Sequence, residues 1–152
     1  MIKWTSLIAA GLMLAIATPA AAQSRNPQID YPGFERLTRD VSGLRATRLL
    51  DFTAFETMAA RPGTLILDAR SRDAYRRGHI RGAVNLPFTD FTDEALAKVI
   101  GPNRDRPILI YCNNNFSNNR APVPMKSRPL ALNIQTFINL VGYGYGNVWE
   151  LD

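Results

Sequence analysis

The chain has 152 residues and a formal net charge of +5, with 46% hydrophobic residues and a single cysteine. This length allows one domain with its own core. Basic and acidic residues are interleaved without a dense basic block, which argues against a nucleic-acid-binding surface. Because one cysteine cannot pair within its own chain, Cys112 is expected to be an inert thiol, half of an intermolecular disulfide, or a nucleophile.

Residues 1–22 have the features of a secretory signal peptide. Lys3 supplies the positive start, residues 7–17 form an apolar run too short to span a bilayer, and the small residues around Ala22 offer a cleavage site. We expect cleavage near Ala22, which leaves a mature chain of residues 23–152 without a membrane span. The expected location is the bacterial periplasm or the medium. A retained N-terminal anchor is the alternative.

Hydrophobic patterns and turn signals divide the remaining chain into alternating helices and strands. Residues 23–45 are expected to form an N-terminal linker or extension, with a weak helical pattern over residues 34–44. Thr53 and Glu56 form a capping-box signature for the first helix of the domain. The predicted helices span about 53–60, 71–77, 92–100 and 129–141, and the predicted strands span 46–50, 64–67, 83–86, 107–111 and 147–151.

The clearest predicted strands are continuous apolar runs, which are typical of a parallel sheet covered by helices on both faces. Ligands of such sheets bind beyond the carboxyl ends of the strands. Asp68 ends one predicted strand and Cys112 follows another. We therefore expect both residues at the same rim of the sheet, and this placement favours a nucleophilic role for Cys112.

Four segments carry motifs that occur together in one family. They are LILDAR at residues 65–70, GHIRGAVNLP at 78–87, ILIYC at 108–112 and GYGNVWEL at 144–151. In this order they resemble a rhodanese-like domain over residues 46–152. The resemblance implies a three-layer α/β fold with a central parallel sheet and helices on both faces. It also implies a sulfurtransferase, in which Cys112 accepts a sulfane sulfur from a thiosulfate-type donor and passes it from a persulfide to a nucleophilic acceptor.

The loop after the cysteine is longer than in typical members of that family. There, a few residues connect the cysteine to an arginine that opens the next helix, whereas here seven residues separate Cys112 from Arg120. Cationic side chains and amide donors of the loop and the rim are expected to bind an anionic donor. The expected substrate-binding residues are Arg120, Asn113, Asn114, Asn115, Arg70 and Lys126. Asp68 and His79 are expected to have structural roles at the rim.

No spacing of histidine, cysteine and acidic residues resembles a metal site, and we expect neither a metal nor a cofactor. The expected partners are a small anionic sulfur donor and a protein that accepts the sulfur. Two alternatives remain open for the function. The first is a catalytically inactive rhodanese-like module that binds a partner. The second is a cysteine phosphatase or arsenate-reductase type of enzyme, in which Arg120 would grip the oxyanion.

Overall fold

The computed structural model describes residues 26–117 and 124–152, and residues 32–152 form one compact unit. In the preceding unit, the Asn26 side chain accepts a hydrogen bond from the amide of Gln28. Within the described residues, the helices are α1 (Tyr31–Ala46), α2 (Phe52–Ala59), α3 (Arg72–Arg77), α4 (Asp93–Ile100) and α5 (Leu132–Gly142). The strands are β1 (Leu49–Leu50), β2 (Leu65–Asp68), β3 (Val84–Asn85), β4 (Ile108–Tyr111) and β5 (Val148–Leu151). Short 3₁₀ turns lie at η1 (Phe88–Asp90), η2 (Asn113–Asn115) and η3 (Arg128–Leu130).

The five described strands form one parallel sheet in the order β1-β5-β4-β2-β3. The predicted central parallel sheet is therefore confirmed. Strands β2 and β4 are neighbours, with Asp68 opposite Tyr111. Because parallel strands end at the same edge, Asp68 and the residue that follows β4, Cys112, lie at one rim, as expected from the sequence.

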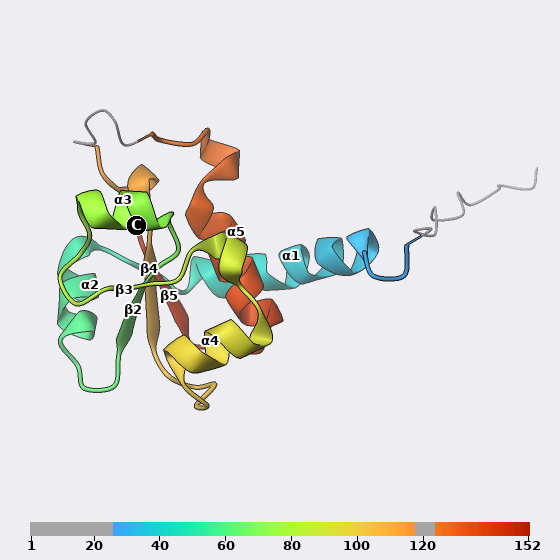
Figure 1. Ribbon diagram of the computed structural model, residues 1–152, viewed down its shortest axis with the longest axis horizontal. Helices are drawn as coiled ribbons and strands as arrows, with labels where there is room; N and C mark the ends of the chain where they lie inside the picture. The colour runs from blue at the N-terminus through green and yellow to red at the C-terminus, as the bar shows by residue number, and fades with distance from the viewer. Residues whose placement is uncertain (1–25, 118–123) are drawn as a thin grey trace, which may run out of the picture. The chain divides into compact units, whose positions relative to one another are not determined.

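Helices cover both faces of the sheet (Figure 1), with α2 and α3 on one side and α4 and α5 on the other. All four residues of β2 and all four of β4 are buried, because successive side chains point to opposite covered faces. On the α4 and α5 side, Leu96 and Phe137 pack on Leu67 and its neighbours. On the α2 and α3 side, Phe55 packs with Leu109. This is the expected three-layer α/β arrangement.

Helix α1 (Tyr31–Ala46) covers most of the segment 23–45 that we predicted to be a linker or extension, and it packs on the domain. Val41 is 3% exposed and is part of the core on the α4 and α5 side, and Leu37 and Leu44 pack against the same core. The weak helical pattern over residues 34–44 reflects this buried stripe. The folded unit therefore begins before residue 46.

The cap of α2 differs from the prediction. The helix begins two residues before the expected position, and Asp51 is its N-cap, with Oδ1 accepting from the Ala54 amide at 2.8 Å. A carboxylate accepts this bond and also interacts favourably with the positive end of the helix dipole, so Asp51 takes the place predicted for Thr53. The caps predicted at Ser71 and Thr92 are confirmed.

The predicted helix at residues 129–141 is divided into two pieces. Pro129 lies in the 3₁₀ turn η3, the backbone is extended at Ala131 (ψ 136°), and α5 then begins at Leu132. As a result, Leu130 is 57% exposed and is not part of the apolar face that the pattern suggested. Among helices within residues 26–117 and 124–152, none is long and apolar enough to cross a membrane.

Candidate active site

Cys112 lies directly after β4, where it is the N-cap residue of the turn η2. The residue is only 2% exposed, yet it borders two cavities, of about 520 and about 480 Å³. The strand fixes its backbone on one side and the short turn fixes it on the other. The thiol is therefore held at the rim that parallel α/β proteins use for ligands.

A reciprocal capping box closes the turn after the cysteine. The amide of Cys112 donates to Oδ1 of Asn115 at 2.7 Å, and the Cys112 side chain faces the backbone amide of Asn115. The Asn115 amide also donates to the carbonyl of Cys112 at 3.2 Å. The sequence predicted Asn115 as a substrate-binding residue. In the structure its side chain bonds the backbone of Cys112 and of Leu151 in β5.

The other two asparagines of the turn hold the returning end of the loop. Nδ2 of Asn113 donates to the carbonyl of Pro124 at 3.0 Å. Nδ2 of Asn114 donates to the carbonyl of Lys126 at 2.8 Å, and its Oδ1 accepts from the Lys126 amide at 3.2 Å. Both asparagines line the larger cavity beside Cys112, but these side-chain groups already have protein partners.

Arg70 and Asp68 form a buried ion pair at the rim. Nη2 of Arg70 lies 2.6 Å from Oδ2 of Asp68, and Nε lies 2.9 Å from Oδ1; the two residues are 9% and 0% exposed. Nη1 of Arg70 then donates to Oδ1 of Asn113 at 2.8 Å, and Nη2 also donates to the carbonyl of Gly78. Arg70, predicted to bind substrate, lines the larger cavity beside Cys112, and its guanidinium donates to partners at the rim that connect the ends of β2 and β4.

Tyr111 is a site residue that the sequence reasoning missed. Its hydroxyl donates to Oδ2 of Asp68 at 2.5 Å and accepts from the amide of Ile80 at 3.1 Å. Burial raises the pKa of Tyr111 well above its ordinary value, and the hydrogen bond to Asp68 raises it further. The phenol therefore stays protonated and acts as a structural donor. The sequence did contain a signal for this contact. Tyr111 ends β4 as Asp68 ends β2, and in a parallel pair of strands these two residues lie opposite each other.

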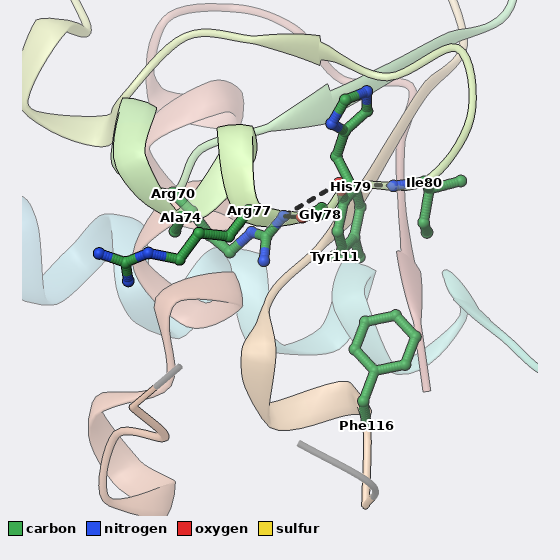
Figure 2. A pocket seen from close by; sticks show the side chains of 8 residues that line it. All are labelled: Arg70, Ala74, Arg77, Gly78, His79, Ile80, Tyr111 and Phe116. Atoms are coloured by element: carbon green, nitrogen blue, oxygen red, sulfur yellow. Dashed lines mark hydrogen bonds between the residues drawn. The ribbon is translucent and has the colours of Figure 1, made fainter. Parts of the chain in front are cut away.

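His79 lies at a neighbouring cavity of about 320 Å³ and not at either cavity that Cys112 borders. Its ring stacks on Tyr75 at a centroid distance of 3.8 Å, and Nδ1 lies 2.9 Å from the Tyr75 carbonyl oxygen. Figure 2 shows His79 and Tyr111 in this cavity, with Arg77 on the α3 side and the ring of Phe116 on the other. A structural role for His79 agrees with these contacts.

Three cationic side chains border the larger cavity together with Cys112: Arg70, described above, Arg77 and Lys126. Arg77 comes from the last turn of α3, and Lys126 comes from the segment after residue 123. Asp73 also lines this cavity, and it pairs with Arg76. The sequence had predicted Lys126 but not Arg77. Arg120, the other cation predicted to bind the donor, lies outside the described residues.

Metal ligands do not gather at this rim. In residues 26–117 and 124–152, no group of three or more histidine, cysteine, aspartate or glutamate residues is placed to hold a metal ion. The described site contains a thiol, hydrogen-bond donors and the three cations of the larger cavity.

Comparison with known proteins identifies the family. A sequence model of the rhodanese-like domain matches residues 51–152. The chain belongs to the rhodanese-like family. This match covers more than half of the chain and contains β2, β4, Cys112 and the buried Asp68–Arg70 pair described above.

Individual proteins that resemble this rhodanese-like chain match it over part of its length or at low sequence identity. The HTH-type transcriptional regulator Rv0324 of Mycobacterium tuberculosis is 37% identical over 51 residues, a stretch that covers 34% of this chain and 21% of that protein. This chain thus spans about a fifth of the length of that relative. Among solved structures, the Alr3790 protein from Anabaena sp. is 24% identical, with a TM-score of 0.48, covering 68% of this chain and 70% of its own. The single-domain sulfurtransferase RDL2 of Saccharomyces cerevisiae is 15% identical, with a TM-score of 0.46, covering 68% and 81%.

Proposed function

We propose that this rhodanese-like chain is a sulfurtransferase that carries a sulfane sulfur as a persulfide on Cys112. The observation that carries the proposal is the position of Cys112 at the carboxyl end of β4, in one cavity with Arg77 and Lys126. A cavity of about 520 Å³ has room for a small donor. The cationic side chains that line it, Arg77, Lys126 and Arg70, favour an anion such as thiosulfate over a neutral molecule.

The proposed reaction has two displacement steps at sulfur. The Cys112 thiolate attacks the outer sulfur of thiosulfate, a new S–S bond forms, the original S–S bond breaks, and sulfite leaves with the electron pair. An acceptor thiolate then attacks the outer sulfur of the persulfide, and the Cys112 thiolate leaves. Arg77 and Lys126 hold the anionic donor in the first step, which is the positioning that covalent catalysis needs.

The remaining rim residues support this chemistry by holding the turn and the returning loop in place. The buried carboxylate of Asp68 holds Arg70, and Arg70 holds the turn through Asn113. The Asn114 side chain holds the backbone of Lys126, which keeps that residue beside the cavity. We further propose that the mature chain is exported after cleavage near Ala22 and passes its sulfur to a protein thiol.

Mass spectrometry of the intact protein tests the proposal. The mature chain is incubated with thiosulfate, and the expected product is an adduct of one sulfur atom that maps to Cys112. C112S is the matched control, because it replaces only the sulfur and should form no adduct. Loss of the adduct on treatment with a small thiol, with recovery of the free Cys112 thiol, would demonstrate the second step.

The burial of Cys112 favours one other candidate, a rhodanese-like module that binds a partner without catalysis. The residue is 2% exposed, so a bulky acceptor must reach the sulfur through one of the two cavities. If the folded wild-type protein forms no adduct with thiosulfate or with other anionic sulfur donors, the sulfurtransferase proposal is wrong. The binding module and the cysteine phosphatase or arsenate-reductase type of enzyme are then the remaining candidates, and turnover of an aryl phosphate that depends on Cys112 separates them.

A further inference from the structure

A half-buried ion pair lies on the opposite side of the sheet from Asp68 and Arg70. Glu150 of β5 is 4% exposed, and each of its carboxylate oxygens accepts from Arg45 of α1 at 2.6 Å. This contact raises the pKa of Arg45, so the guanidinium stays charged.

The same carboxylate leads to the cysteine through two asparagines. Nδ2 of Asn133, in the first turn of α5, donates to Oε1 of Glu150 at 3.2 Å and to Oδ1 of Asn115 at 3.0 Å. Oδ1 of Asn115 also accepts from the amide of Cys112 at 2.7 Å, and Nδ2 of Asn115 donates to the carbonyl of Leu151.

These hydrogen bonds determine the orientation of the side-chain amides of Asn133 and Asn115, that is, which end carries the oxygen. If the Asn133 amide were turned over, its oxygen would face the carboxylate of Glu150 and the oxygen of Asn115. Three acceptors would then meet without a proton between them, which is costly in a buried site. Glu150 therefore orients Asn133, and Asn133 keeps the oxygen of Asn115 in the place where it accepts from Cys112.

We propose that Glu150 and Asn133 are positioning residues for Cys112. They orient the Asn115 side chain, and that side chain holds the Cys112 backbone so that the thiol borders its two cavities. The consequence for sulfur transfer rests on the proposed function, whereas the placement of the thiol does not. These contacts connect α1, β5 and α5 to the active-site turn. Arg70 contacts the same turn from the other side of the sheet.

The test compares N133A with N139A. Both asparagines lie on α5, but Nδ2 of Asn139 donates only to a carbonyl of its own helix, that of Gln135. The first readout is the rate of Cys112 alkylation by iodoacetamide at fixed pH. The second is single-turnover persulfide formation at varied thiosulfate. We expect N133A to lower both rates by about fivefold, which corresponds to one net hydrogen bond of about 1 kcal/mol.

Two further readouts separate positioning from a general loss of structure. The thiosulfate concentration that gives half of the maximal rate should not change in N133A, because Arg77 and Lys126 are intact. E150Q keeps an acceptor for Asn133 and should retain most of the alkylation rate, whereas E150A should resemble N133A. If N133A does not fold, N133S, whose hydroxyl cannot bond both neighbours at once, should slow alkylation in its place.

The proposal is overturned if N133A alkylates as fast as the wild type, if N139A slows alkylation equally, or if E150Q is as slow as E150A. These outcomes are distinct from failure of the proposed function. A wild-type protein that forms no persulfide would refute sulfur transfer, but its alkylation rates would still decide whether Glu150 and Asn133 position the thiol.

Discussion

The hydroxyl of Tyr111 donates to the carboxylate of Asp68 across two adjacent strands, and the two residues are register partners of β4 and β2. Arg70 binds the same carboxylate from the segment after β2 and reaches Asn113 in the turn after Cys112. The ends of β2 and β4 are thus connected twice. The Tyr111–Asp68 hydrogen bond connects the strands themselves, and Arg70 connects the segments that follow them. Loss of the Asp68 carboxylate would therefore remove the contact that holds Arg70 beside Asn113.

The first prediction concerns the hydrogen bonds of Tyr111. Y111F removes a donor from the buried carboxylate of Asp68 and an acceptor from the amide of Ile80. We expect the free energy of unfolding to fall by about 1–3 kcal/mol, since buried polar groups lose their partners. Chemical denaturation measures the change. Y31F, at a tyrosine that is 71% exposed, is the control; equal losses in both variants would contradict the assigned role.

The second prediction is a pH dependence that comes from the same phenol. The pKa of Tyr111 in the folded protein is raised by burial and by Asp68. The unfolded chain therefore releases this proton first, near pH 10, while the folded protein keeps it. The stabilisation is fully present below about pH 10 and is lost as the pH rises toward the raised value, by at most about 1.4 kcal/mol per pH unit.

Denaturation curves between pH 9 and pH 11 measure this loss. Y111F lacks the titrating group, so its stability should fall less steeply with pH than that of the wild type, and Y31F should follow the wild type. If the slopes of Y111F and the wild type agree, Tyr111 does not hold its proton in the folded state.

The third prediction concerns Arg77. R77A removes a cation from the cavity that Cys112 borders, so thiosulfate should bind less tightly. We expect the half-saturating thiosulfate concentration to rise by about fivefold, as expected from a charge contact of about 1 kcal/mol. The maximal rate of persulfide formation should change little. R72A is the matched control, because Arg72 lies on the same helix, pairs with Asp90 and does not line this cavity. A lower maximal rate with unchanged half-saturation would assign Arg77 another role.

The fourth prediction distinguishes the two capping residues considered for α2. D51A should lower the free energy of unfolding by about 1 kcal/mol, because the amide of Ala54 loses its acceptor. T53A should have an effect close to zero, since Asp51 and not Thr53 is the N-cap. Thermal or chemical denaturation measures both. A larger loss in T53A would restore the cap predicted from the sequence.

The sequence predicted the features of this fold that depend on short stretches of chain. Apolar runs bounded by turn residues were enough for β2 and β4, and the parallel arrangement then placed Asp68 and Cys112 at one rim. Ser71 and Thr92 were predicted as caps because a hydroxyl before a helical pattern is a local signal. The two errors were also local. Asp51, two residues before Thr53, is the N-cap of α2, and the extended backbone at Ala131 separates Pro129 from α5.

The features that escaped prediction depend on contacts between distant segments. Arg45 and Glu150 lie 105 residues apart, and nothing near either one reveals the other. Asn115 was assigned to substrate because it is polar and follows the cysteine, whereas its partners come from α5 and β5. Arg77 looks like an ordinary basic residue at a helix end. Only the packing of α3 beside the turn brings it to the cavity with Cys112.

The contact between Arg45 and Glu150 has a practical consequence for anyone who shortens this protein. The family match begins at residue 51, which invites truncation there, yet Arg45 and the strand β1 precede that boundary. A protein cut at residue 51 would keep the buried carboxylate of Glu150 and lose its counter-ion, and β5 would become an edge strand. We therefore expect a truncated protein to need α1 for full stability, because this helix covers part of the core and supplies the counter-ion of Glu150.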